Sequence, residues 1–564
     1  MAVLHSEEPI LSKACAERIP VSQNRYQWVA LGDVNAFFGL MLDNIADLAL
    51  TVGLLAGIYG FPTSFALRYM VPGTAIGVFV GDLLFFALAI LLARKTRRTD
   101  VTAMPLGLDT PSTFGMVFFV LGPAYTGAVS RGLSVEAAAL HTWHLGICAI
   151  FISGLFKLAC AGASHRIRRL VPRAGLLGSL TAVALVLISF LPLVETLHSP
   201  VVGFVAVAVI FTALVARVPL PGRIPGALGA LLIAGAIHYC MRGLGLLESE
   251  ASIDFVWMPQ DWTAAFRCEW FAAMRESLNY LPLVIPFALA TVVGGIDCTE
   301  SASAAGDEFN TSVVVGIEAI ATIVAALCGG VIQTTPYIGH PAYKAMGGRA
   351  AYVLATALFV GGAGVFGYFG LLYEFIPKPA ILPILMFIGL EITSQSFQAT
   401  PQKHYPAVAL ACVPALASLT LIFVDNVFGE LQAISYVVPG QGQMAHVSPA
   451  SLSQKLQLDL FVVRVLANGF IVTSLLWASM LAAMIDRQLL RAAAILGLCG
   501  VSSLFGLIHS PLTGSRVFLP WQLEAREMAM TGQIVAGYLL AALLLLGWHG
   551  LNGRLADRTQ TLHA

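Results

Sequence analysis

The residues best suited to chemistry lie in one region of the chain, residues 289–349. Its first part carries Asp297, Glu300 and Ser301, spaced so that one face of a helix would present all three side chains. The surrounding sequence is apolar enough to cross a bilayer, where an ionisable group costs roughly 2.5–3.5 kcal/mol. We therefore expect Asp297 and Glu300 to contact a ligand and to carry a coupling proton. The alternative is that either carboxylate only bonds to a neighbouring helix.

The second part of this region interrupts the apolar pattern with prolines and glycines. Broken backbone at membrane depth is tolerated only where it is buried in protein or lines a wet cavity. We expect this segment to contact ligand through hydroxyl, amide or backbone groups at Gln333, Thr334, Thr335, Tyr337, Gly339 and His340. His340 is either a proton relay, a substrate contact or a structural histidine.

A similar break occurs in the first half of the chain, in residues 103–125. There Asp109, Thr110 and Ser112 surround a proline, which suits the first turn of a helix with its cap. If the two breaks face each other near the midplane, two helix N-termini point at one place, which favours an anion or the carbonyl oxygens of a ligand. The alternative is that both are ordinary proline kinks.

Other polar residues at membrane depth have weaker assignments. Asp43, Asn44 and Asp47 in the first apolar span border the site or tie that span to the opposite half. We expect inter-helix polar ties from Asp82, Glu318 and Glu391. Lys157 lies near the end of its span, so we expect its amine to reach the membrane surface.

The composition is that of a membrane protein. Hydrophobic residues make up 58% of the 564 residues and charged residues 11%, against roughly 25% charged in soluble domains. Lys plus Arg and Asp plus Glu both number 31, so net charge gives no indication of nucleic acid. The nine cysteines include no CxxC pair, and nucleotide-binding, hydrolase and zinc-protease motifs are missing. We expect no enzyme activity, cofactor or metal.

About sixteen apolar segments are long enough to cross a membrane, two of them discontinuous. Residues 1–26 are polar and have no apolar core segment, so we expect no cleavable signal peptide there. Basic loops fall on one side if the N-terminus is cytoplasmic, which also places the C-terminus there. We therefore expect a multi-pass protein of the cytoplasmic (inner) membrane.

Three features recur in the same order in both halves: an acidic span, a broken span and a span led by a proline and a base. Because the repeating unit has seven crossings, the second copy must insert upside down, as a seven-plus-seven inverted repeat with an extra C-terminal helix pair. The expected fold is thus an all-α polytopic transporter. Its expected parts are an N-terminal tail (1–26), core repeat 1 (27–165), gate repeat 1 (166–241), an extracytoplasmic loop (242–279), core repeat 2 (280–373), gate repeat 2 (374–487) and C-terminal helices (488–564).

These motifs resemble the xanthine/uracil/ascorbate permeases, the second nucleobase–cation symporter family, and within it the adenine/guanine/hypoxanthine branch. The similar segments are Gly294–Glu300, Gln333–Tyr337 with Gly347–Arg349, and Met104–Asp109. The acidic position of many members falls on Gly339 or on Gln333. The resemblance implies a fourteen-span fold with core and gate domains, a homodimer and proton symport. It also implies that substrate is held between the two broken spans and the span that carries Asp297 and Glu300.

The sequence therefore favours secondary transport of a nucleobase, such as a purine, xanthine or uracil, coupled to protons or another cation. The alternative is an anion transporter or channel of the sulfate/bicarbonate type on the same fold. A membrane scaffold or sensor without transport is a third interpretation. The expected partners are a small-molecule substrate, the coupling cation, the lipid bilayer and a second copy of the chain.

Overall fold

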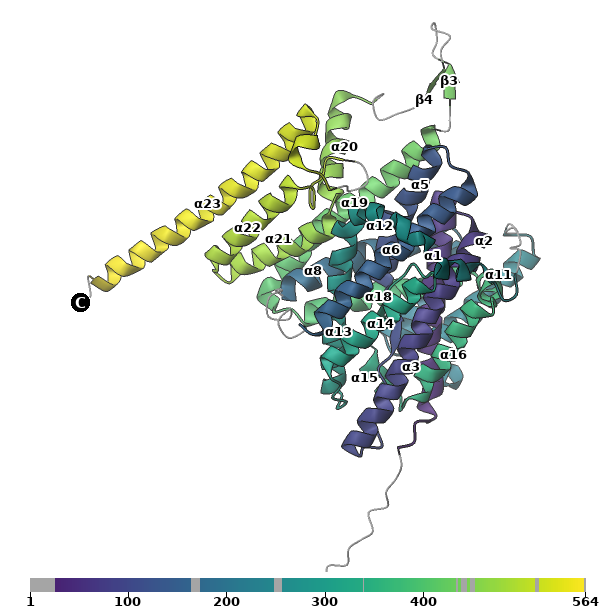
Figure 1. The fold of residues 1–564 in the computed structure, drawn as a ribbon. Coiled ribbons are helices and arrows are strands. Elements are labelled where there is room, and N and C mark those ends of the chain that lie inside the picture. The colour runs from purple at the N-terminus through teal and green to yellow at the C-terminus, as the bar shows by residue number, and fades with distance from the viewer. Residues whose placement is uncertain are drawn as a thin grey trace, which may run out of the picture.

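The computed structural model describes residues 26–163, 173–247, 256–337, 339–432, 435–437, 444–446, 452–512 and 517–561. Most of this part of the chain is helical (Figure 1). The elements of the first half are α1 (Gly32–Tyr59), α2 (Thr63–Phe65), α3 (Val71–Thr96), β1 (Leu106–Leu108), α4 (Thr110–Met116), α5 (Gly122–Ser130), α6 (Val135–Ala161), α8 (Arg173–Val183), α9 (Phe190–Thr196), α10 (Pro200–Ile210) and α11 (Gly226–Gly243). Short π-helical segments join α2 to α3, α4 to α5 and α8 to α9.

The second half begins with short helical turns and then follows the same order. Its elements are α12 (Met274–Ser277), α13 (Leu281–Ala304), α14 (Thr311–Leu327), β2 (Thr334–Pro336), α15 (His340–Ala345), α16 (Ala351–Val365), α17 (Phe369–Phe375), α18 (Lys378–Gln398), α19 (Tyr405–Gln432), β3 (Ser435–Val437), β4 (Met444–His446), α20 (Gln454–Ala467), α21 (Phe470–Ile485), α22 (Leu489–Leu504) and α23 (Ala525–Thr561).

The two predicted breaks are the strand–helix units β1–α4 and β2–α15. The strands pair antiparallel, with Gly107 opposite Thr335, so the helices that follow them run in opposite directions from one point. The pair is extended at both ends, since the Asp109 amide donates to the Gln333 carbonyl and the Tyr337 amide to the Pro105 carbonyl. This arrangement confirms the predicted all-α polytopic membrane fold with two inverted repeats and two discontinuous helices.

Polar side chains from neighbouring helices hold the first break in place. The Asp82 carboxylate on α3 accepts a hydrogen bond from the Leu106 amide at 3.0 Å. The Asn44 side chain on α1 accepts one from the Leu108 amide at 3.1 Å. A buried backbone donor left without a partner would cost free energy, so these side chains replace the hydrogen bonds that a continuous helix would have made. Asp82 is therefore a polar tie, as predicted.

The helices pack in two groups. In one group α3 lies against α14 and α16, and α6 lies against α13 and α14. In the other, α8, α19 and α21 contact one another, and α18 contacts α8, α10 and α11. Contacts between the groups are made by α1, which reaches α11 and α18, and by α13, which reaches α21.

Two predicted spans are bent instead of straight. The chain turns by 93° between α16 and α17, and by 74° between α20 and α21. At the second bend Gly469 has a φ of +71°, which a residue with a side chain rarely adopts. Within the described residues nine helices are long and apolar enough to cross a membrane, or up to eleven if each bent pair counts as one span. The prediction of about sixteen is higher because it also counts short helices, such as α10, α14 and α22, and the β2–α15 unit.

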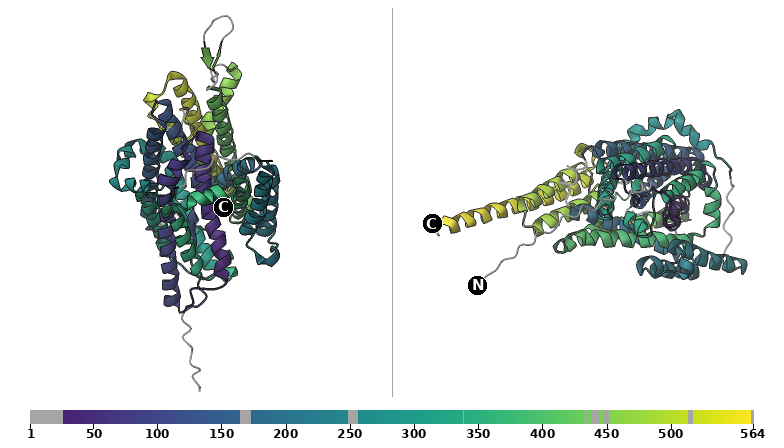
Figure 2. Two further views of the ribbon diagram at one scale, coloured as in Figure 1. Left: turned by 90° about the vertical axis from the view of Figure 1, so that its right-hand side faces the viewer. Right: turned by 90° about the horizontal axis from the view of Figure 1, so that it is seen from below.

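The predicted extra helix pair is α22 and α23, which lie side by side and extend away from the body (Figures 1 and 2). A buried hydrogen-bond chain attaches the pair to α20 and α21. His509 contacts the Val465 carbonyl through Nδ1 at 3.2 Å and the Tyr538 hydroxyl through Nε2 at 2.7 Å. The Trp477 indole N–H donates to the same hydroxyl. Because a carbonyl only accepts, Nδ1 carries the proton of a neutral His509, and Tyr538 donates to Nε2.

Candidate functional site between the interrupted spans

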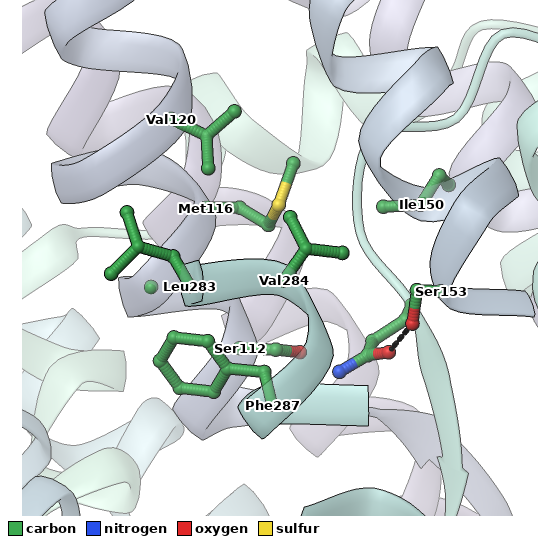
Figure 3. Close-up of a pocket in the computed structure, with 10 residues that line it drawn as sticks. Ser112, Met116, Val120, Ile150, Ser153, Leu283, Val284 and Phe287 are labelled. Atoms are coloured by element: carbon green, nitrogen blue, oxygen red, sulfur yellow. Dashed lines mark hydrogen bonds between the residues drawn. The ribbon is translucent and has the colours of Figure 1, made fainter. Parts of the chain in front are cut away.

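A small pocket lies beside the point where the two interrupted spans meet (Figure 3). Its walls come from α4, the following π-helical turn, α6 and α13, and its free volume for a water-sized group is about 10 Å³. That volume holds about one water molecule. The lining residues are mostly apolar: Ser112, Gly115, Met116, Val120, Ile150, Ser153, Leu283, Val284, Phe287 and Gln333.

Three polar side chains, on Ser112, Ser153 and Gln333, line this pocket. The Ser153 hydroxyl donates to Gln333 Oε1 at 2.5 Å, and the Gln333 amide is also within hydrogen-bonding reach of the Asp109 carboxylate. Asp109 caps the helix that follows, because its carboxylate accepts from the Ser112 amide at 3.0 Å. The structure therefore brings together Asp109 and Ser112 of the first interrupted span and Gln333 of the second.

A buried ion pair lies one helical turn from Ser153 on the same face of α6. Lys157 Nζ is 2.8 Å from Glu318 Oε1 on α14, and both side chains are fully buried. The same amine donates to the Thr334 carbonyl at 2.8 Å, on β2. The prediction that Lys157 reaches the membrane surface is wrong, because its amine turns inward to a carboxylate and a strand carbonyl. Glu318 is an inter-helix tie, as predicted, and it joins α14 to α6 through an ion pair with the Lys157 amine.

Gly295 on α13 makes room for this ion pair. A Cβ at that position would lie 2.8 Å from Glu318 Oε2, which is too close for ordinary contact. The neighbouring Gly294 has open space at the same position. The two glycines of the Gly294–Glu300 motif therefore have different roles, and only the second is required by a close approach.

The predicted acidic helix, α13, lies against both interrupted spans. It contacts β2, α4 and α15, and the Cys298 thiol on this helix donates to the Pro336 carbonyl at 3.3 Å. Asp297, Glu300 and Ser301 are half-buried near its C-terminal end. The pocket is lined instead by Leu283, Val284 and Phe287, about three turns earlier on the same helix. The structure thus places the carboxylates beside the second break but outside the pocket.

The acidic residues of α1 lie on the other side of β1. Asp43, Asn44 and Asp47 are buried, and the Thr110 hydroxyl donates to Asp47 Oδ2 at 2.9 Å. The predicted border residues therefore contact the first break directly, through Thr110 and through the Asn44 bond to the strand.

The remaining predicted residues of the second break have separate surroundings. The Thr334 hydroxyl lies 3.2 Å from the Thr322 hydroxyl of α14, and Thr335 is half-buried on β2. The Tyr337 ring stacks on the Tyr343 ring, and a Cβ at Gly339 would meet the Tyr337 ring at 2.5 Å. None of these four predicted residues lines the pocket.

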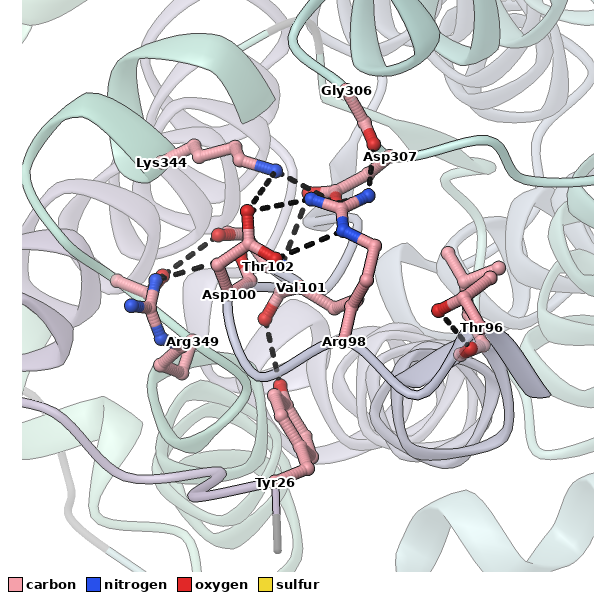
Figure 4. A network of polar contacts seen from close by, with 12 residues as sticks. Tyr26, Thr96, Arg98, Asp100, Val101, Thr102, Gly306, Asp307, Lys344 and Arg349 are labelled. Carbon is pink, nitrogen blue, oxygen red and sulfur yellow. Dashed lines mark hydrogen bonds and ion pairs between the residues drawn. The ribbon is translucent and has the colours of Figure 1, made fainter. Parts of the chain in front are cut away.

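His340 belongs to a charged cluster just after α13, of which Arg98, Asp307 and Lys344 are labelled in Figure 4. Its Nε2 is 3.3 Å from Asp307 Oδ2, which also accepts from the Thr102 amide. Lys344 and Arg98 pair with Asp307 Oδ1 at 2.7 and 3.2 Å. Burial acts to raise the pKa of Asp307, but the hydrogen bonds from His340, Lys344 and the Thr102 amide hold that pKa below its ordinary value. His340 therefore joins the start of α15 to the loop after α13, as a structural contact.

Sequence reasoning missed two members of this site, Ser153 and the inward-facing Lys157. A signal was present, because the two residues are four apart on one apolar helix and so share a face. A base and a hydroxyl on one face of a membrane helix usually point toward the protein interior.

Comparison of the fold with solved structures finds similarity to anion transporters. No family model matches the chain, and no curated protein matches it. Similar in fold are the transmembrane domain of a cyanobacterium bicarbonate transporter, BicA (14% identity, 70% of this chain and 96% of that one, TM-score 0.44), and SLC26A9 (11%, 93% and 91%, TM-score 0.46). A third is the murine anion transporter Slc26a9 in its inward-facing state (11%, 75% and 72%, TM-score 0.36).

At these identities the likeness concerns the fold alone. The resemblance to the xanthine/uracil/ascorbate permeases is wrong: no family model matches the chain, and the solved structures named above are bicarbonate and anion transporters. The segments that suggested it are Gly294–Glu300 on α13, the two strand–helix breaks and the turn Gly347–Arg349. The breaks form the paired strands β1 and β2, so their residue pattern reflects backbone geometry and does not identify a substrate.

Proposed function

We propose that the chain is a secondary transporter of a small anion of the bicarbonate or sulfate type, which passes through the pocket between the interrupted spans. The observation that carries the proposal is the buried Lys157, one helical turn from the pocket residue Ser153. Anion pathways in membranes use basic side chains and neutral hydrogen-bond donors.

The pocket itself suits a small ligand. It offers hydroxyl and amide groups from Ser112, Ser153 and Gln333 within apolar walls. A free volume that holds about one water molecule needs little opening for an ion of a few atoms. A bicyclic purine would require a much larger rearrangement, so the nucleobase interpretation is not retained.

The partner of Lys157 gives the site a means of responding to an anion. In the described structure the amine is neutralised by Glu318 and held by the Thr334 carbonyl of β2. An anion in the pocket would compete with Glu318 for the same positive charge. Binding would therefore change the contact between α6, α14 and the second break.

In this proposal the helix group that contains α3, α6, α13, α14 and α16 is the core, which carries the site. The group that contains α8, α18, α19 and α21 is the gate. A homodimer, cytoplasmic termini and placement in the inner membrane belong to the same proposal. Cysteine labelling from each side of the membrane and chemical cross-linking of the purified protein test these parts.

The function is tested by uptake into proteoliposomes that contain the full chain. We expect labelled bicarbonate, sulfate or chloride to accumulate above the level of protein-free liposomes, and uracil and adenine to remain at that level. Background uptake of all three anions would overturn the proposal. Uptake of a nucleobase without any anion would favour the first sequence interpretation instead.

A further inference from the structure

Two buried carboxylates on α1 have no role in the pocket described above. Asp43 and Asp47 are one helical turn apart on the same face, and their side chains are only 4% and 0% exposed. Asn44 lies between them and holds the Leu108 amide of β1. The face that carries these residues is turned toward the first interrupted span.

These carboxylates lack a positive partner. Neither forms an ion pair with a Lys, Arg or His in the part of the chain that the structure describes, in contrast to Glu318 with Lys157 and Asp307 with Lys344. Within the same residues, Asp43 Oδ1 and Asp47 Oδ1 are buried and accept no hydrogen bond. Two ionised carboxylates so close together in a buried site repel each other and lose their hydration, so something must neutralise them.

The surrounding groups do not supply that charge. The Asp109 carboxylate acts on Asp47 from the start of α4, and Tyr337 is within electrostatic reach of Asp43, Asp47 and Glu391 of α18. Tyr343 of α15 is likewise near Asp43 and near Asp82 of α3. All of these groups are carboxylates or phenols, so they add negative charge or none.

The strand beside these carboxylates presents a glycine to them. β1 has no side chain at Gly107, where a Cβ would lie 3.6 Å from Asn44 Oδ1 and 3.7 Å from Asp43 Oδ2. Oxygen atoms of Asp43 and Asn44 therefore lie beside Gly107, and Asp47, one turn further along α1, accepts from the Thr110 hydroxyl. Hard cations prefer oxygen ligands of this kind.

We infer that Asp43 and Asp47, with the Asn44 side-chain oxygen, bind a monovalent cation, either a proton or Na⁺, that is coupled to anion movement. A divalent ion is not indicated, because no group of three or more His, Cys, Asp or Glu side chains that could hold a metal occurs among the described residues. The coupling part of this inference rests on the proposed function, whereas the cation site does not.

The first interrupted span connects the cation site to the pocket. Asp47 holds the Thr110 hydroxyl, and Ser112, two residues later, lines the pocket. A cation at Asp43 and Asp47 neutralises the charge that would otherwise repel an anion entering beside Thr110 and Ser112. One cation and one anion would therefore bind more readily together than either alone, which is positive coupling between two sites.

The cation site is tested first without any anion, by thermal unfolding of the purified full chain. Melting temperature is measured in NaCl and in choline chloride at several pH values, for the wild type, Asp43→Asn, Asp47→Asn and the exposed-site control Glu374→Gln. If Na⁺ is the ligand, it raises the melting temperature of the wild type and of Glu374→Gln in a saturable way, and the rise is lost in both Asp variants. If the proton is the ligand, Na⁺ has no effect, and the wild-type dependence on pH is flattened in both Asp variants only.

Both results support the site and identify the cation. Responses to Na⁺ and pH that are the same in all four proteins would overturn it. Coupling is then tested in proteoliposomes, where a gradient of the identified cation should accelerate anion uptake by the wild type and Glu374→Gln but not by Asp47→Asn. Equal acceleration in Asp47→Asn overturns the coupling. Cation binding without any anion uptake would sink the proposed function and its coupling while leaving the cation site intact.

Discussion

Lys157 and Glu318 form a fully buried ion pair, with 2.8 Å between the amine and the carboxylate, in helices that contact each other along the membrane-spanning part of the protein. The pair also touches the second interrupted span, because Lys157 donates to the Thr334 carbonyl. One contact thus joins α6, α14 and β2. Any ligand that changes the charge near Lys157 acts on all three elements.

Removing one member of this pair should destabilise the protein strongly. Lys157→Met leaves the Glu318 carboxylate buried and uncompensated, for which we expect a loss of about 3–5 kcal/mol of unfolding free energy. The double variant Lys157→Met/Glu318→Gln removes both charges and should recover most of that stability. Thermal unfolding in detergent measures the difference. Anion uptake should be lost in both variants, and a double variant that is folded and transports normally would show that the amine is not part of the anion path.

The two glycines of α13 provide a matched pair of substitutions. Gly295→Ala places a methyl group 2.8 Å from Glu318 Oε2, so the carboxylate must move away from Lys157. We expect a cost of about 1–3 kcal/mol, typical of overpacking in a core. Gly294→Ala meets open space and should unfold at the wild-type temperature or slightly above it. Equal melting temperatures for the two variants would contradict the packing described for Gly295.

The cluster around Asp307 should make stability depend on pH in acid. Because the pKa of Asp307 is lower in the folded protein, its ionised form stabilises the fold above its ordinary pKa of about 3.9. That contribution is lost as the pH falls through the lowered value. Asp307→Asn should therefore unfold at a lower temperature than the wild type at pH 7, and the gap should narrow below about pH 4. Glu308→Gln, at the exposed neighbouring position, should show no such gap at either pH.

His509 should have an effect at milder acidity. Burial lowers its pKa to about 4, although the Val465 carbonyl acts in the opposite direction. Between the ordinary value of about 6.5 and the folded value, only the unfolded chain takes up the proton. Stability should therefore decline as the pH falls from about 6.5 to about 4.

The variant His509→Gln isolates this effect. Its melting temperature should change less between pH 7 and pH 5 than that of the wild type, since Gln does not titrate. The exposed His198, on the turn before α10, provides the control variant His198→Gln, which should retain the full wild-type dependence on pH. If His509→Gln kept the wild-type dependence, His509 would not be the neutral link between α20 and α23.

Local sequence predicted the parts of the fold that depend on local chemistry. Proline and glycine interrupt the apolar pattern at both breaks, so β1–α4 and β2–α15 could be placed within a few residues. The bends after α16 and α20 were not predicted, because their segments are mostly apolar on both sides of the bend and the turn depends on one or two residues. Gly469 is one of these, and a glycine in a membrane helix does not by itself indicate a bend of 74°.

The candidate site was predicted less completely than the fold. Asp109, Ser112 and Gln333 were predicted correctly as neighbours because each lies on a break that had to face its counterpart. The positions of His340 and Lys157 were harder to predict, since their surroundings depend on partners far along the chain. His340 contacts Thr102 and Asp307, and Lys157 contacts Glu318 and Thr334. Long-range contacts of this kind are determined by packing. For Lys157 the local sequence indicated only the inward-facing side of the helix, through its spacing from Ser153, and not the partner.

Anion uptake by Gln333→Glu proteoliposomes tests the central claim most directly. The substitution nearly preserves shape but places a carboxylate beside Ser153 at the pocket. We expect the variant to remain folded, as judged by its melting temperature, and to lose anion uptake, while Gln402→Glu at an exposed position keeps the wild-type rate. A folded Gln333→Glu protein that takes up anion as fast as the wild type would show that the pocket between the interrupted spans is not the path.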